Sequence, residues 1–106
     1  MHSRIDRVNK LIGQKISSIL HDDILEPDQY FAITHVETSP DLGYCDIEIS
    51  FLKDGDDLIK AVVDNQKQIT LILSRSIELR KTPKLRFHLD RRSEQAVKIE
   101  ELFKKI

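Results

Sequence analysis

The sequence predicts an α+β fold, a two-layer sandwich in which helices cover one face of a three-stranded sheet. Apolar residues recur at helical spacing over residues 4–25 and again from residue 58 to residue 77. Three further segments, 30–38, 44–51 and 84–90, have the composition or the alternation of strands. A chain of 106 residues is long enough for one hydrophobic core, so we expect a single domain spanning residues 1–106.

The first expected element is a helix from about residue 4 to about residue 25. Its apolar positions follow steps of three, four and one, at Ile5, Val8, Leu11, Ile12, Ile16, Ile19, Leu20 and Ile24. Ser3 is placed to cap the start of this helix, and Pro27 lies beyond its end. Gly13 inside the helix costs about 1 kcal/mol of helix propensity, which indicates close packing against a neighbour.

Two strands follow, joined by a short turn. Residues 30–38 are rich in aromatic and β-branched side chains, and residues 39–43 are typical of a turn. In residues 44–51 an apolar face of Cys45, Ile47, Ile49 and Phe51 alternates with Tyr44, Asp46, Glu48 and Ser50. The short link predicts an antiparallel, hairpin-like pair. Because Cys45 is on the apolar face, we expect a buried structural thiol and not a nucleophile.

The second half of the chain begins with the acidic loop 54–57, which we interpret as a helix cap because no calcium-loop pattern follows it. The apolar helical face that comes next is interrupted by the polar residues 64–68, where two short helices meet or one long helix bends. Ile77 and Leu79 close this apolar run, and Pro83 prevents the helix from continuing. Residues 84–90 then alternate as a half-buried strand, which can join either edge of the sheet. Residues 96–106 predict a short amphipathic C-terminal helix.

Charge is strongly segregated along the chain, although the net charge is only −1. Residues 1–20 carry a net charge of +3, and residues 65–92 carry +6. Residues 21–64 hold twelve acids against two lysines. If the fold brings the first and third of these segments together, the molecule has one basic and one acidic face. The alternative is that opposite charges pair across the surface, and Arg80 or Arg86 could bond to acids of the hairpin in this way.

The pattern of side chains favours a protein that binds nucleic-acid backbone over an enzyme. The four histidines lack the close pairing of a metal site, and no glycine-rich phosphate loop is present. The few aromatic residues do not support a base-stacking platform. We therefore expect no catalysis, no metal and no cofactor, and phosphate contacts from basic side chains. The main candidates are Arg75, Arg80, Lys81, Lys84, Arg86, Arg91 and Arg92, supported by Arg4, Arg7 and Lys10.

Two fragments resemble a known family. One runs from Ser39 to Cys45 and continues through residues 47–52, and the other runs from Leu79 to Phe87 and ends at Asp90. Shorter matches lie at Arg7-Val8, at Ile19-Leu20 with Ile24 and Pro27, and at Thr34 with Val36. With these fragments in this order, nearly the whole chain resembles ribosome-binding factor A, a small bacterial assembly factor of the 30S ribosomal subunit.

The resemblance implies a type II KH-like fold, α-β-β-α-α-β, which agrees with the order derived above. It also implies binding to the 30S subunit and its 16S rRNA during late rRNA maturation, with importance for growth in the cold. Separately, the single cysteine is consistent with a reducing compartment, so we expect a cytoplasmic protein. The family's alanine-any-glycine kink corresponds to Asn65-Gln66-Lys67, so that signature is absent. An alternative function is a protein-interaction module that docks on a ribosomal protein or dimerises through a sheet edge. We expect a monomer. We also expect no membrane association, because no apolar run approaches the length of a membrane span and the N-terminus lacks the apolar segment of a signal peptide.

Overall fold

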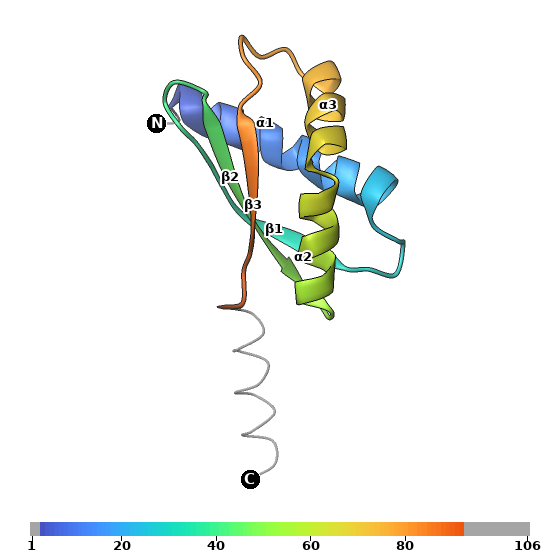
Figure 1. Ribbon diagram of the computed structural model, residues 1–106. Coiled ribbons are helices and arrows are strands. Elements are labelled where there is room, and N and C mark those ends of the chain that lie inside the picture. Colours follow the sequence, from blue (N-terminus) through green and yellow to red (C-terminus); the bar gives the residue numbers. More distant parts are fainter. Residues whose placement is uncertain (1–2, 93–106) are drawn as a thin grey trace.

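The computed structural model describes residues 3–92 and has the predicted α+β architecture (Figure 1). The fold is KH-like, with the element order of the type II arrangement. The elements in chain order are α1 (Arg4–Ile19), the π-helical turn η1 (Leu20–Ile24), β1 (Phe31–Thr38), β2 (Tyr44–Phe51), α2 (Gly55–Asp64), α3 (Gln66–Ser76) and β3 (Lys84–Leu89). The expected C-terminal helix at 96–106 lies outside the described residues.

The sheet has the strand order β1-β2-β3. β1 and β2 form the predicted antiparallel pair, and β3 lies parallel to β2 on its other side. The sequence did not predict which edge of the β1–β2 pair the third strand joins. In the structure β3 joins the free edge of β2. Because α2 and α3 carry the chain back along the sheet after β2, β3 can run in the same direction as β2.

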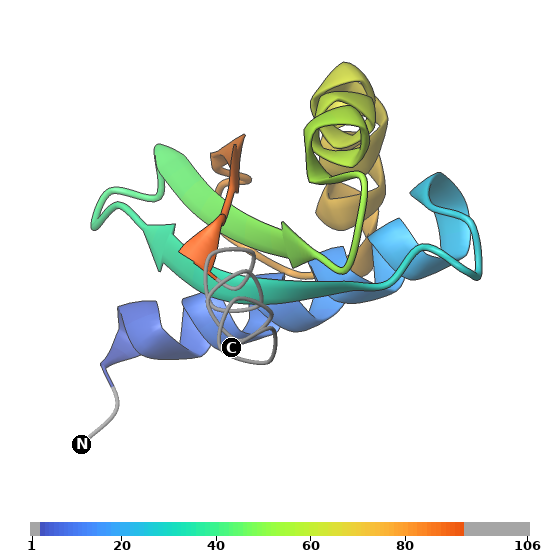
Figure 2. The same ribbon diagram turned by 90° about the horizontal axis from the view of Figure 1, so that it is seen from below.

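One face of the sheet is covered by all the helices. Ile47, Ile49, Leu85 and Phe87 on β2 and β3 are buried, and they share a core with Ile12, Ile16, Leu20, Val62, Ile69 and Leu73 from the helices. Figure 2 shows α1 running alongside β1, with the α2–α3 pair next to β2 and β3. Cys45 is completely buried, and burial raises the pKa of its thiol, as expected of a structural cysteine.

The first helix is capped and packed as the sequence predicts. The Ser3 hydroxyl accepts a hydrogen bond from the Asp6 N–H, and Asp6 accepts one from the Ser3 N–H, which forms a capping box. A Cβ atom at Gly13 would lie 3.2 Å from Cγ2 of Val36, so the glycine allows α1 and β1 to approach closely. The helix ends with a wider turn, in which Leu25 N–H donates to Leu20 O at 2.8 Å and both side chains are buried.

The polar run at 64–68 is where two helices meet. Asn65 leaves the helical conformation with φ −100° and ψ 14°, and its side-chain amide donates to Ala61 O at 2.7 Å. α3 ends at Ser76, so the prediction that the helix reaches Ile77 and Leu79 was wrong. Ile77 adopts an extended conformation because its half-buried side chain packs against the core as the chain turns towards β3.

The loop at 54–57 and the end of β3 differ from the predicted structure. Asp54 lies at the N-cap of α2, but its side chain makes no capping hydrogen bond, and its backbone is left-handed with φ 59°. The acids of the first turn, Asp56 and Asp57, therefore act through the helix dipole alone. β3 ends at Leu89, and Asp90 is buried beyond it instead of continuing the exposed face of the strand.

No helix among the described residues is long and apolar enough to cross a membrane.

Candidate nucleic-acid interface

Segments far apart in the sequence meet at one end of the sheet. Lys84 N–H donates to Gly43 O at 2.9 Å, so the start of β3 lies beside the β1–β2 turn. On the other side of this turn, Thr38 N–H donates to Asn9 Oδ1 at 2.9 Å, which brings the N-terminal half of α1 to the same end. The two fragments with the strongest family resemblance are thus neighbours in space.

The β1–β2 turn is held by a compact network of hydrogen bonds. The Ser39 hydroxyl donates to Asp41 Oδ1 at 2.7 Å and accepts from the N–H groups of Gly43 and Tyr44, both at 3.0 Å. These bonds stabilise Leu42 in a left-handed conformation, with φ 59°. The Ser39 hydroxyl and the Gly43 N–H hold the pKa of the Asp41 carboxyl below its usual range, so Asp41 stays ionised beside Lys81.

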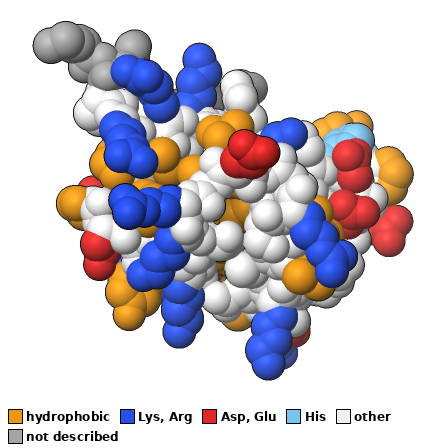
Figure 3. Space-filling model, turned by 90° about the horizontal axis from the view of Figure 1, so that it is seen from above, with side chains coloured by type: hydrophobic (Ala, Val, Ile, Leu, Met, Phe, Trp, Pro, Cys, Tyr) orange, Lys and Arg blue, Asp and Glu red, His pale blue; other side chains and the backbone are white. Residues whose placement is uncertain are grey.

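Seven of the ten predicted RNA-binding residues lie on α1, on the last turn of α3, on the connection that follows it and at the first position of β3, and we call this set the basic end. All seven are exposed, and within residues 3–92 none of them forms an ion pair shorter than 4.0 Å. Figure 3 shows lysine and arginine side chains gathered over this end, with acidic side chains concentrated on the η1 side. The basic end consists of Arg4, Arg7, Lys10, Arg75, Arg80, Lys81 and Lys84.

The other three predicted residues are engaged with carboxylates. Arg86 donates from Nε and Nη2 to the two oxygens of Asp46, each at 2.8 Å. Arg92 donates to Asp90 Oδ2 at 2.9 Å and to Glu48 Oε2 at 3.3 Å, and Arg91 forms an ion pair with Asp56. A phosphate at any of these three arginines would have to compete with a carboxylate that is already in place. The alternative that Arg86 bonds to an acid of the hairpin is therefore confirmed, whereas no pattern in the sequence indicated the carboxylate partners of Arg91 and Arg92.

The open face of the sheet is consequently a network of paired charges. His88 Nε2 lies 2.9 Å from Asp46 Oδ1, and the Arg86 guanidinium stacks 4.6 Å from the centre of the Tyr44 ring. The hydrogen bonds from Arg86 and then from His88 lower the pKa of Asp46, and Asp46 in turn raises the pKa of Arg86. His88 lies on the exposed face of the strand that the alternation in residues 84–90 predicts, but its partner Asp46 was not predicted. The parallel pairing of β2 with β3, which creates this contact, is not visible in the sequence.

A model of the family described as "Ribosome-binding factor A" matches residues 4–103. The chain belongs to the ribosome-binding factor A family. A ribosome-binding factor A from Vesicomyosocius okutanii subsp. Calyptogena okutanii is 31% identical over 105 residues, covering 97% of this chain and 92% of the relative.

Solved structures of the ribosome-binding factor A family share this fold. The crystal structure of the factor from Thermus thermophilus has a TM-score of 0.73 at 14% identity, covering 83% of this chain and 97% of that one. Coordinates of a Thermus thermophilus homology model, fitted into a cryo-EM map of a complex between the 30S subunit and ribosome-binding factor A, have a TM-score of 0.62 at 16% identity. They cover 82% of this chain and 91% of that one.

Proposed function

We propose that this protein is a 30S assembly factor that binds the small subunit and its 16S rRNA in the cytoplasm and assists late rRNA maturation without catalysing a reaction. In this proposal residues 1–106 form one KH-like ribosome-binding domain. The observation that carries the proposal is the basic end, where seven exposed cations without an ion-pair partner among the described residues converge from three parts of the chain. Membership of the family and the complex reported for the Thermus thermophilus protein support it.

The basic end is suited to phosphate groups on structured RNA. Arginine can donate two parallel hydrogen bonds to one phosphate, and each neutralised phosphate releases bound counterions. The β1–β2 turn is held by several hydrogen bonds and lies directly beside Lys84, so it supports the cations near it. The side of the molecule formed by η1 and the following loop, with Asp22, Asp23, Glu26 and Asp28, would be repelled by rRNA and would therefore orient the bound protein.

A comparison of two triple variants tests this assignment. The first replaces Arg80, Lys81 and Lys84 with Gln, and the second replaces Arg86, Arg91 and Arg92 with Gln. Both remove three positive charges, but the first removes cations of the basic end and the second removes arginines that are bonded to carboxylates. Co-sedimentation with purified 30S subunits, measured over a range of salt concentrations, reports both the affinity and the number of phosphates neutralised.

We expect the first variant to bind 30S subunits much more weakly. The slope of log K against log salt, which is negative, should become shallower by roughly 2 to 3. The second variant should bind 30S subunits nearly as well as the unmodified protein, because its arginines are occupied by carboxylates. Circular dichroism confirms that each variant is folded. Equal losses in the two variants would contradict the assignment to the basic end, and binding that does not depend on salt would favour the alternative of docking on a ribosomal protein.

A further inference from the structure

The outer edge of β1 has no neighbouring strand among residues 3–92, because β2 occupies only its inner side. In an antiparallel pair, every second residue directs its N–H and C=O groups away from the partner strand. Thr38 is such a residue, and its outward N–H is bonded to Asn9. Val36, two positions earlier, therefore also directs its backbone groups outward, where no described residue bonds to them. This edge can accept another extended chain.

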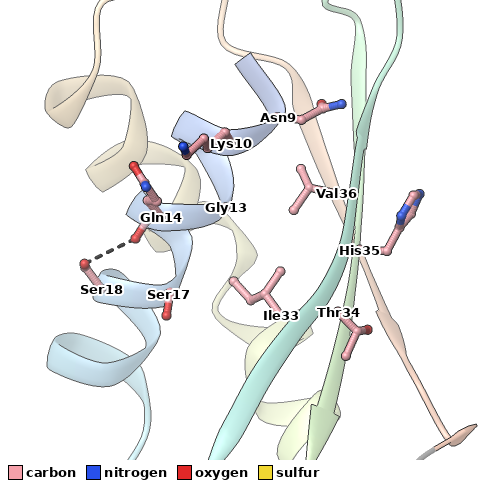
Figure 4. Close-up of a pocket in the computed structure, with 10 residues that line it drawn as sticks. All are labelled: Asn9, Lys10, Gly13, Gln14, Ser17, Ser18, Ile33, Thr34, His35 and Val36. Atoms are coloured by element: carbon pink, nitrogen blue, oxygen red, sulfur yellow. Dashed lines mark hydrogen bonds between the residues drawn. The ribbon is translucent and has the colours of Figure 1, made fainter. Parts of the chain in front are cut away.

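A groove of about 690 Å³ runs between this edge and α1 (Figure 4). Ile33 and Val36 point towards α1, whereas His35 points away from it, because a register shift between Ile33 and His35 changes the alternation of β1. The α1 side of the groove is polar and contains Asn9, Lys10, Gly13, Gln14, Ser17 and Ser18. A peptide backbone suits this groove, because it can form hydrogen bonds to polar groups on the α1 side and to the open edge of β1.

The groove continues along β1 beyond the region drawn in Figure 4. A second hollow of about 360 Å³ shares Ser17 and Ser18 with it and extends to Tyr30 and Phe31. Together the two hollows follow the strand edge from Val36 back to Tyr30, whose side chain is 66% exposed. The space is therefore elongated and parallel to β1.

The two ends of this groove carry opposite charges. Lys10 lines the end near Val36, and Asp22 lines the end near Tyr30. A ligand with a negative charge at one end and a positive charge at the other would match both ends of the groove. Nucleic acid, which is negative throughout, would be repelled at the Asp22 end.

We propose that this groove binds an extended peptide segment of a protein partner, which adds to the sheet as a fourth strand antiparallel to β1. In this orientation the N-terminal end of the peptide lies near Lys10 and is acidic, and its C-terminal end lies near Asp22 and is basic. Backbone hydrogen bonds to the free edge provide affinity, and the two charged ends set the direction. The site shares only Lys10 with the basic end, and it does not depend on the proposed rRNA contacts.

The test uses the synthetic peptide acetyl-Glu-Thr-Val-Thr-Val-Thr-Lys-amide and a second peptide with the reverse order of residues. Amide chemical shifts of the full 106-residue chain are followed by NMR during titration. We expect changes confined to residues 30–38 and to the facing side of α1, with the reversed peptide binding about two- to tenfold more weakly. Asp22→Lys should abolish this preference, whereas Asp64→Lys, with the same change of charge at the end of α2, should keep it.

A blocking variant provides the second measurement. Ser18 is exposed and lines both hollows, so Ser18→Arg should fill the groove without disturbing the core and should abolish the shifts. Gln68→Arg, on an exposed position of α3, adds the same charge elsewhere and should leave binding unchanged. Absence of peptide-induced shifts, shifts that persist in Ser18→Arg, an octauridine RNA that shifts the same amides, or concentration-dependent shifts along β1 without peptide would each overturn the proposal.

Discussion

Arg86 on β3 donates two 2.8 Å hydrogen bonds to Asp46 on β2, and so an arginine that the sequence offers as an RNA contact instead joins two strands of the sheet. The pair lies in register across the parallel β2–β3 interface. The arginines Arg86 and Arg92 are therefore already engaged with carboxylates, whereas Lys84 and the other cations of the basic end have no such partner among residues 3–92 and are available to a ligand.

Acid should destabilise the protein through Asp46 and Asp90. Bonds from Arg86 and His88 lower the pKa of Asp46, and bonds from Arg92 strongly lower the pKa of Asp90. In the unfolded chain an aspartate has a pKa of about 3.9, so the unfolded state binds more protons than the folded state just below this pH. The stabilisation is thus complete above about pH 5 and is lost as the pH falls through the folded pKa values.

Urea unfolding at pH 7 and at pH 3 measures this effect. Asp90→Asn and Asp46→Asn should each be less stable than the unmodified protein at pH 7 and should lose less stability on acidification. Asp28→Asn is the matched control, because Asp28 is exposed and makes no hydrogen bond within the described residues. If Asp90→Asn and Asp28→Asn showed the same pH dependence, the Asp90–Arg92 pair would not be the origin of acid sensitivity.

Replacement of Gly13 should reveal a conflict between helix propensity and packing. Alanine gains about 1 kcal/mol of helix propensity, but its Cβ would lie 3.2 Å from Cγ2 of Val36. We expect Gly13→Ala alone to change the free energy of unfolding by less than about 1 kcal/mol. In a Val36→Ala background the contact is relieved, and Gly13→Ala should then stabilise by up to about 1 kcal/mol. A double-mutant cycle by urea unfolding measures the coupling, and strict additivity would show that the two sites do not interact.

Gln66 should anchor the start of α3 to β3. Its side-chain amide donates to Leu85 O at 2.5 Å, on the edge of β3 that has no neighbouring strand among the described residues. Gln66→Met keeps the length of the side chain but removes the donor, and we expect a loss of about 1 kcal/mol in the free energy of unfolding. Gln68→Met, two positions along the helix and exposed, should cost far less. Similar losses in the two variants would indicate that the hydrogen bond contributes little.

Asp54 should be a site where glycine stabilises the protein. Its φ of 59° is left-handed, its side chain is exposed, and that side chain makes no capping hydrogen bond. Asp54→Gly should therefore raise the melting temperature, with a gain of about 0.5 to 1 kcal/mol. Asp54→Val should lower it, because a β-branched side chain is strained in this conformation. A lower melting temperature for the glycine variant would indicate that the carboxylate stabilises the start of α2 through the helix dipole.

Local sequence patterns predicted the parts of this fold that depend on residues close together in the sequence. The alternation in residues 44–51 correctly identified both faces of β2, since side chains in a strand must point to opposite sides. The helical spacing from Ile5 to Ile24 identified a continuous helical segment, and Gly13 marked its close contact with β1. The extent of α3 was overestimated because Ile77 continues the apolar pattern while its backbone is already extended.

The candidate site could be predicted only in part, because some of its features depend on residues that are far apart in the sequence. Charge segregation along the chain indicated a basic surface, because a segment with eight bases and two acids cannot neutralise itself. Which arginines remain available depends on carboxylates far away in the sequence, as with Arg86 and Asp46 or Arg92 and Glu48. The groove along β1 likewise requires α1 and an unpaired strand edge to lie side by side.

The sequence by itself determined the elements, their buried faces and the segregation of charge, because these follow from the periodicity and composition of contiguous residues. Only the tertiary structure decided that β3 joins β2 in parallel, that the β1–β2 turn lies against Lys84, and that Arg86, Arg91 and Arg92 are bonded to acids. These relationships depend on distances between residues about 35 to 45 positions apart, and side-chain pairing at that separation is set by strand register. The Asp90–Arg92 bond is local, but it forms only because the chain buries Asp90 at the end of β3.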